Sequence, residues 1–137
     1  MILRKNFKIV LLFTLILFFG CLPDYRGYYG DEGEMLLEYL IPTQLLDLTE
    51  NPDTQIRIID VRSLSEYQAG HIPTAESFPS SEIESRLNEL STDDYLILHC
   101  HTGIRAQGVI IGILEPNSYT RFMNWGGTIH WPYDFVQ

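Results

Sequence analysis

Lysine is absent after position 8, and cysteine occurs only at positions 21 and 100. Three of the nine basic residues, Arg4, Lys5 and Lys8, precede position 20, so six remain against 18 acidic residues, a formal charge of −12. Such a surface repels phosphate backbones, which argues against nucleic-acid binding and favours a solvated surface. No metal site is expected, because compact ligand spacing is missing among the four histidines, His71, His99, His101 and His130.

The composition is that of an ordinary globular protein. Apolar residues make up 45% and charged residues 20% of the 137 positions, which excludes a disordered tail or a fibre. The length predicts one compact domain, since domains commonly have roughly 100–200 residues. A chain of this size can bury a core without disulfides or metals.

A targeting segment is expected at the N-terminus. The basic stretch 1–8 precedes the almost entirely apolar run 9–20. These twelve apolar residues match the roughly 7–15 of a signal-peptide core and fall short of the ~20 that a membrane-spanning helix needs. The basic residues stand on the side that stays in the cytoplasm. We therefore expect residues 1–20 to be a signal peptide and the remainder to be exported.

Gly20-Cys21 follows at once and resembles the cleavage site of bacterial lipoproteins. There the cysteine receives a diacylglycerol, becomes the new N-terminus and tethers the protein to a membrane without spanning it. Phe18 and Phe19 depart from the aliphatic and small residues usual at that site. The resemblance implies lipidation of Cys21 and a periplasmic or cell-surface location on a bacterial membrane. An uncleaved signal anchor or an ordinary secretory signal is the alternative.

The remainder divides into a tether over 21–34, rich in glycine and tyrosine, and a folded domain over 35–137. Strands that alternate with helices predict an α/β fold, with a mostly parallel central sheet covered by helices on both faces. Apolar runs predict strands at 56–61, 95–98 and 121–124, and capping residues and apolar spacing predict helices at 44–48, 63–67, 82–90, 106–114 and near 131.

One short segment carries the chemistry. Cys100 follows an expected buried strand, at the edge where ligands bind to open α/β sheets. Backbone N–H groups of the next loop, and the positive end of the following helix, can stabilise a thiolate or a bound anion. Arg105 can hold an oxyanion with two parallel hydrogen bonds. An inert buried cysteine is the plainer alternative. The expected substrate-binding loop consists of His101, Thr102, Gly103, Ile104 and Arg105.

Three stretches together resemble the rhodanese family of sulfurtransferases. The Cys-x-x-Gly-x-Arg pattern at 100–105 is similar to the active-site loop of that family. The resemblance covers about 35–137 and implies a rhodanese-like domain. The other matching stretches are Asp60-Val61-Arg62, Glu66-Tyr67, Gly70-His71-Ile72-Pro73-Thr74-Ala75, Trp125-Gly126-Gly127 and Trp131-Pro132.

The resemblance implies a mechanism without a cofactor. The Cys100 thiolate attacks the outer sulfur of a small sulfur-containing anion such as thiosulfate, and sulfite leaves. The resulting persulfide passes its sulfur to a thiol or a cyanide-like acceptor, which is covalent catalysis in two steps. Asp60 and Arg62 are implied to support the site structurally, through charge-assisted hydrogen bonds at the sheet edge.

Two alternatives stay open. One is a non-catalytic or weakly catalytic rhodanese-like module that binds a partner or relays sulfur. The other is a rhodanese-fold phosphatase or arsenate reductase. Related phosphatase loops hold five residues between cysteine and arginine, whereas this loop holds four, which favours a sulfane sulfur over a phosphate. His99 supports the phosphatase alternative, because His-Cys also begins those loops.

Overall fold

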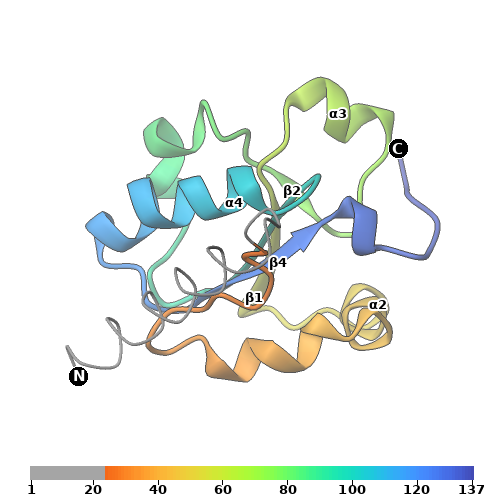
Figure 1. Cartoon of the computed structure of the whole chain (residues 1–137), viewed down its shortest axis with the longest axis horizontal. Coiled ribbons are helices and arrows are strands. Elements are labelled where there is room, and N and C mark those ends of the chain that lie inside the picture. Colours follow the sequence, from red (N-terminus) through yellow and green to blue (C-terminus); the bar gives the residue numbers. More distant parts are fainter. Residues whose placement is uncertain (1–23) are drawn as a thin grey trace, which may run out of the picture.

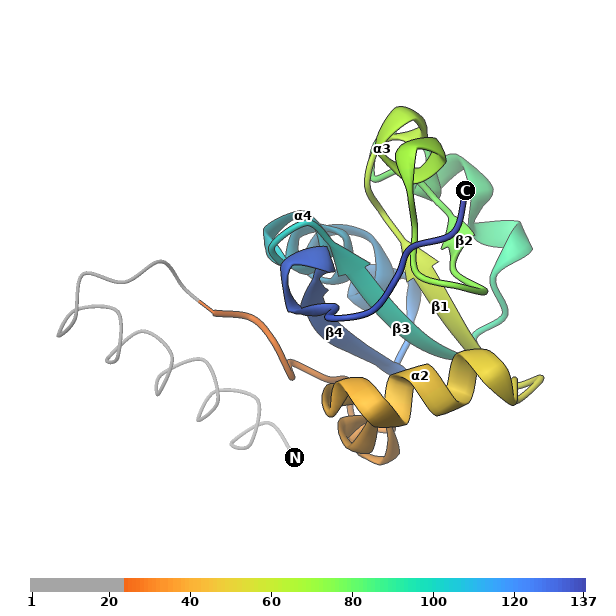
Figure 2. The same ribbon diagram turned by 90° about the vertical axis from the view of Figure 1, so that its right-hand side faces the viewer.

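The computed structural model describes residues 24–137, and the expected signal peptide 1–20 and Cys21 lie outside the described residues. A four-stranded sheet in the order β2–β1–β3–β4 forms the centre, and all neighbouring strands are parallel. The strands run side by side toward the edge at which α3 and the start of α4 lie (Figures 1 and 2). They are β1 (Ile56–Asp60), β2 (Glu76–Ser77), β3 (Tyr95–Cys100) and β4 (Phe122–Gly127).

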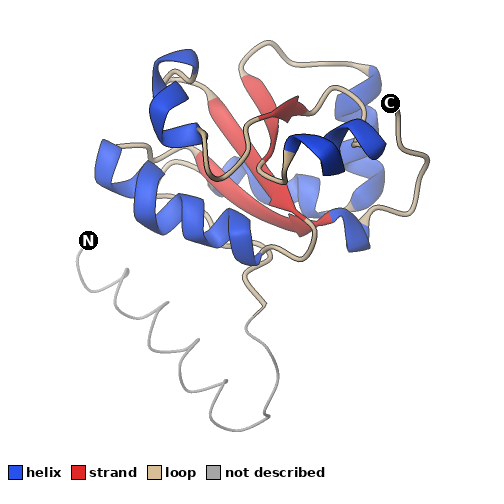
Figure 3. Cartoon of the chain, turned by 90° about the horizontal axis from the view of Figure 1, so that it is seen from above, coloured by secondary structure: helices blue, strands red, loops and turns tan. Residues whose placement is uncertain are grey.

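Helices cover both faces of the sheet, as Figure 3 shows. In the described part of the chain, no helix combines the length and the apolar character that a membrane span needs. The α-helices are α2 (Pro42–Glu50), α3 (Leu64–Ala69) and α4 (Ile104–Val109), and the 3-10 or π-helical segments are η1 (Glu34–Leu40), η2 (Ile83–Glu89), η3 (Ile110–Leu114), η4 (Glu115–Asn117) and η5 (Thr128–His130).

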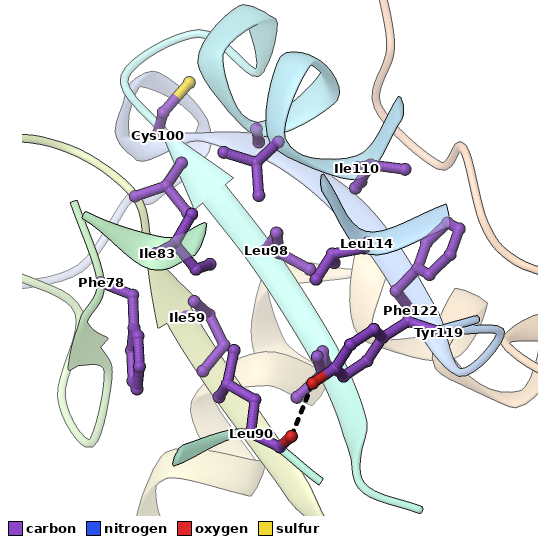
Figure 4. Packing of buried hydrophobic residues seen from close by; sticks show 14 residues of the cluster. Ile59, Phe78, Ile83, Leu90, Leu98, Cys100, Ile110, Leu114, Tyr119 and Phe122 are labelled. Carbon is purple, nitrogen blue, oxygen red and sulfur yellow. Dashed lines mark hydrogen bonds between the residues drawn. The ribbon is translucent and has the colours of Figure 1, made fainter. Parts of the chain in front are cut away.

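The central strand β3 divides the core into two layers. Successive side chains of a strand point to opposite faces, so Leu98 and Cys100 join the cluster that packs on α4 and η2 (Figure 4). Ile97 points the other way and joins the cluster that includes Leu45 of α2 and Trp125 of β4. Burial on both faces explains why β3 is apolar almost throughout.

The α/β fold with a parallel sheet is therefore confirmed, with shifts in several elements. The helix expected at 82–90 is the 3-10 segment η2, and the one expected at 106–114 begins earlier, at Ile104, and becomes π-helical at Ile110. The sequence analysis did not anticipate η1 or the two-residue strand β2. Neither has a strong period of apolar residues, so their conformations depend on contacts with the rest of the fold.

Residues 24–33, here named the N-terminal strap, lie along the outer edge of β4. The amides of Gly27 and Gly30 donate to the carbonyls of Asn124 and Phe122 at 2.7 and 3.0 Å, and the Asn124 amide donates to Tyr28 at 2.7 Å. A Cβ atom on Gly30 would lie 2.2 Å from a backbone oxygen, so only glycine permits this approach. The strap covers an otherwise open sheet edge, and this part of the expected tether packs against the domain.

Candidate active site

Cys100 is the last residue of β3, and its side chain is only 1% exposed. Its thiol is free and lies at the carboxyl end of the strand, beside the start of α4 (Figure 4). The backbone N–H of Gly103 donates to the Cys100 sulfur at 3.0 Å. Within residues 24–137 this is the one loop amide with such a bond, so the loop folds back over the sulfur through Gly103.

The loop can fold this way because of glycine. Gly103 has φ +103°, a conformation that favours glycine over every other residue. A Cβ atom there would also lie 3.0 Å from the Cα of Gly126 in β4. Close packing of the two backbones therefore fixes the position of the amide that contacts Cys100.

Asn124 of β4 supports the loop from beneath, and the sequence analysis missed it. Its side chain is fully buried, and Nδ2 donates to the Gly103 carbonyl and to Oε1 of Gln107, both at 3.0 Å. Its Oδ1 accepts the amide of Gly126 at 2.9 Å. Asn124 is the last residue of the strand expected at 121–124, and it gave no local signal because its partners Gly103 and Gln107 lie 21 and 17 residues away.

The other expected loop residues face outward. His101 is exposed, and its Nδ1 lies 3.0 Å from the hydroxyl of Thr128. Its carbonyl accepts the amide of Ile129 at 3.3 Å, which joins the loop to η5. Thr102 is exposed, and Ile104 is 49% exposed. These residues form the rim of the site, whereas Gly103 forms its floor.

Arg105 is held by a carboxylate. Its Nη1 and Nη2 donate to the two carboxylate oxygens of Glu66 at 2.7 and 2.9 Å. Glu66 also closes the capping box of α3, where it accepts the backbone amide of Ser63 at 3.0 Å. The bond to Arg105 is the main reason that the pKa of Glu66 lies well below its usual range. The same bond raises the pKa of Arg105, and the nearby Cys100 adds a smaller effect in the same direction.

The structure therefore gives Arg105 a different neighbourhood from the expected one. From the sequence, its two parallel hydrogen bonds were expected to hold a substrate oxyanion, and here the carboxylate of Glu66 takes that position. The Ser63-x-x-Glu66 spacing is a helix-start signal that the sequence shows. The bond between Glu66 and Arg105, 39 residues later, has no such signal in the sequence.

Asp60 and Arg62 form a buried pair below the sheet edge. Arg62 donates from Nε and Nη2 to the Asp60 carboxylate at 3.0 and 2.7 Å, and from Nη2 to the Gly70 carbonyl at 2.8 Å. Both residues are buried. They connect β1 to the segment that follows α3. Helix α3 itself carries Glu66.

His99 lies beside this pair and away from the loop. Its Nδ1 is 3.2 Å from the Cys100 carbonyl, whereas Nε2 has no hydrogen-bond partner and lies 3.8 Å from Asp60. Burial lowers the pKa of His99 in spite of the carboxylate. The ring is therefore neutral at neutral pH, and the contact with Asp60 is not an ion pair.

The chain is similar in sequence to known proteins that share a rhodanese-like domain. The model of the rhodanese-like domain family matches residues 41–124. The thiosulfate sulfurtransferase GlpE of Pseudoalteromonas translucida is 29% identical over 97 residues, 71% of this chain and 90% of that protein. The Bacillus subtilis proteins YrkF and YqhL are 40% and 35% identical over 55 and 80 residues. The matched parts of this chain span only 30% and 63% of the lengths of those two proteins.

Solved structures share the arrangement of strands and helices. A rhodanese-like domain protein from Staphylococcus aureus is 27% identical, with a TM-score of 0.56 over 66% of this chain and 86% of that one. A rhodanese from E. coli, solved with anions, is 26% identical, with a TM-score of 0.54 over 60% of this chain and 98% of that one. The family match spans β1, the Cys100 loop and the Asn124 support.

Proposed function

Because the chain belongs to the rhodanese-like domain family, we propose that it is a sulfurtransferase that carries sulfane sulfur as a persulfide on Cys100. The single observation that supports this most strongly is the hydrogen bond from the Gly103 amide to the Cys100 sulfur. A backbone donor at 3.0 Å stabilises a negatively charged sulfur without competing as a nucleophile. The family relatives named as sulfurtransferases support the same reaction class.

The reaction takes two displacements. The Cys100 thiolate attacks the outer sulfur of the donor, a sulfur–sulfur bond forms, and the donor's own bond to that sulfur breaks. The electron pair leaves with the donor remnant, which is sulfite from thiosulfate or a thiolate from a thiol persulfide. An acceptor thiolate or cyanide then attacks the terminal sulfur, and the Cys100 thiolate is restored.

Residues of the chain position the groups that this cycle needs around the Cys100 sulfur. Gly103 keeps a donor pointed at the sulfur, and Asn124 fixes the carbonyl of the same residue from the other side. Burial of Cys100 restricts access to reagents that reach the sulfur through the loop. That restriction protects a lone thiol from over-oxidation in an exported protein.

The phosphatase alternative loses its main sequence support. His99 suggested it, yet the ring of His99 is buried beside Asp60, and its hydrogen-bonding contact is with the backbone carbonyl of Cys100. The sulfur-relay alternative differs from the enzyme in its partner and not in its chemistry, because both need the persulfide on Cys100.

Trapping the persulfide tests the proposal. The full chain in a non-ionic detergent is incubated with thiosulfate or with cysteine persulfide, and its intact mass is measured before and after cyanide. We expect a gain of one sulfur atom, loss of that atom to cyanide as thiocyanate, and no gain in Cys100→Ser. A Cys100→Ser protein that still gains sulfur, or a wild-type chain that gains none from either donor, contradicts the proposal.

We further propose that this protein is exported and is anchored to a membrane by a lipid on Cys21. The support is the apolar run 9–20 and the Gly20-Cys21 pair that follows it. A lipid anchor tethers a folded domain to a membrane surface without a spanning helix.

A further inference from the structure

The bond between Glu66 and Arg105 determines the charge at the entrance to the site. Both terminal nitrogens of the guanidinium are used by the two carboxylate oxygens of Glu66. Arg105 also lies close enough to Cys100 for the thiolate to influence its pKa. Arg105, a cation close to the sulfur, is therefore already paired with Glu66.

Glu66 keeps its charge under all physiological conditions. The bonds from Arg105 and from Ser63 lower the pKa of its carboxyl well below the usual range. Its oxygen Oε2 accepts the Ser63 amide at 3.0 Å, the Ser63 hydroxyl at 2.9 Å and Arg105 at 2.7 Å. The carboxylate is therefore fixed by α3 as well as by the loop, and an incoming anion must compete with it for Arg105.

Four of the other five arginines in residues 24–137 do not replace the neutralised charge. Arg57, Arg62, Arg86 and Arg121 are each paired with a carboxylate of their own. Arg26 keeps its charge, and its guanidinium donates to the carbonyls of Trp125 and Leu40. With no lysine after position 8 and a formal charge of −12 after position 20, the surroundings repel a small dianion.

The rim of the site is instead apolar in part. Ile104, from the loop itself, is 49% exposed, and Ile129, whose amide is bonded to the loop at His101, is 56% exposed. An organic carrier of sulfur can pack on such side chains, whereas a sulfite group gains nothing from them.

From this charge arrangement we propose that the donor is a thiol persulfide rather than thiosulfate, and that Glu66 is the positioning residue that sets this preference. The inference rests on the proposed sulfur transfer through Cys100. The reacting species is the hydropersulfide R–S–SH. The Cys100 thiolate forms a bond to its outer sulfur, the S–S bond breaks, and the thiolate R–S⁻ leaves, so the proton stays on the new persulfide. With thiosulfate, the departing sulfite would carry two negative charges past Glu66.

The test compares the two donors in wild-type chain and in Glu66→Gln. Glutamine keeps the capping pattern of α3, since Gln also serves at that position, but removes the charge. Wild-type kcat/KM for cysteine persulfide should exceed that for thiosulfate by about tenfold or more, given the Coulomb repulsion between a dianion and a carboxylate several ångströms away. In Glu66→Gln the ratio of thiosulfate to persulfide kcat/KM should rise by about three- to tenfold.

Glu89→Gln is the matched control. Glu89 forms a similar two-point bond with Arg86, at 2.7 and 3.1 Å, but its segment lies near the start of β1, at the end of the sheet opposite Cys100. Glu89→Gln removes the same charge from the protein and should leave the ratio of thiosulfate to persulfide kcat/KM unchanged. An equal rise in Glu89→Gln would show that net charge, and not the Glu66–Arg105 bond, sets the ratio, which overturns the inference.

A second measurement does not depend on any variant. Salt screens repulsion between exposed charges over about 10 Å at 0.1 M, so kcat/KM of the wild-type chain for thiosulfate should rise with added sodium chloride. A fall with salt, or a wild-type preference for thiosulfate, overturns the inference and leaves the persulfide on Cys100 intact. A chain that accepts sulfur from neither donor overturns the proposed function and this inference with it.

Discussion

Asn124 and Gly103 are joined by a hydrogen bond of 3.0 Å that ties the loop after Cys100 to strand β4. The amide of Asn124 uses both of its polar atoms inside the protein, with Gln107 and Gly126 as further partners. A buried side chain with every bond made holds its neighbours in one arrangement. The position of the Gly103 amide over the Cys100 sulfur thus depends on a residue of the neighbouring strand.

Replacing Asn124 by alanine should therefore damage both stability and activity. The change leaves the Gly126 amide and Oε1 of Gln107 without their buried partner, which costs about 1–3 kcal/mol for each unsatisfied group. Urea unfolding measures the first effect, and persulfide formation on Cys100 the second. Asn117→Ala is the matched control, because Asn117 donates one exposed bond to Ile113 at 2.7 Å. Equal losses in the two variants would contradict this role of Asn124.

Two glycine-to-alanine changes five positions apart in sequence, at Gly103 and Gly108, should have opposite effects. Gly103→Ala introduces a side chain at φ +103° and 3.0 Å from Gly126, so sulfur loading of Cys100 should fall steeply. Gly108 lies in α4 with no atom within 4 Å of an added Cβ, apart from the helix itself. Gly108→Ala should raise the free energy of unfolding by up to about 1 kcal/mol. Thermal melting and intact mass distinguish the two, and a destabilised Gly108→Ala would contradict the described packing.

The buried His99 should make stability depend on pH near neutrality. Burial lowers its pKa below the ordinary value of 6.5, so below that pH the unfolded chain binds a proton that the folded chain does not. The contribution is complete above pH 6.5 and is lost as the pH falls toward the lowered pKa of the folded state. The slope for one proton is at most about 1.4 kcal/mol per pH unit.

His99→Leu removes this dependence. Unfolding free energies of both proteins are measured from pH 7.5 to about pH 5. The wild-type value minus the variant value should decrease as the pH falls, because only the wild type loses the histidine term. A constant difference between the two proteins over that range would mean that His99 takes up its proton in the folded state.

Lipidation of Cys21 predicts incorporation of labelled fatty acid in a bacterial host that processes lipoproteins. Cys21→Ser should abolish the incorporation, since the diacylglycerol would be attached to that cysteine. Cys100→Ser is the matched control and should keep its label. Label that persists in Cys21→Ser would exclude that cysteine as the attachment site.

The sequence predicted the parts of the fold that have local signals. The β-branched run at 56–61 and the apolar run at 95–98 indicated buried strands, and both are present in the parallel sheet. The position of Cys100 at a strand end and the need for glycine at 103 followed from the same pattern. These features depend on residues adjacent in the chain, so a single sequence can reveal them.

The parts that the sequence did not reveal depend on distant contacts. Glu66 was visible as a helix-start residue, but its partner Arg105 lies 39 positions away. In the sequence, Asn124 is an ordinary polar residue of a predicted strand, and its bonds to Gly103 and Gln107 are seen only in the folded structure. The strap along β4 contains glycines, which suggest a flexible linker. Gly30 is needed there for another reason, because the backbone of the strap approaches the backbone at Thr120 closely. Composition alone cannot distinguish these two uses of glycine.

The strap also limits the distance between the sheet edge that carries Cys100 and the proposed attachment at Cys21. Arg26 of the strap stacks on Trp125 at 5.4 Å and lies beside Gly126, the residue that backs Gly103. Five residues lead from Cys21 to Arg26, and five extended residues reach about 18 Å at most. With the proposed lipid on Cys21, Cys100 would work within a thin layer over the membrane. A sulfur carrier in the same membrane would then meet it by diffusion in two dimensions, at an effective concentration far above that in bulk solution.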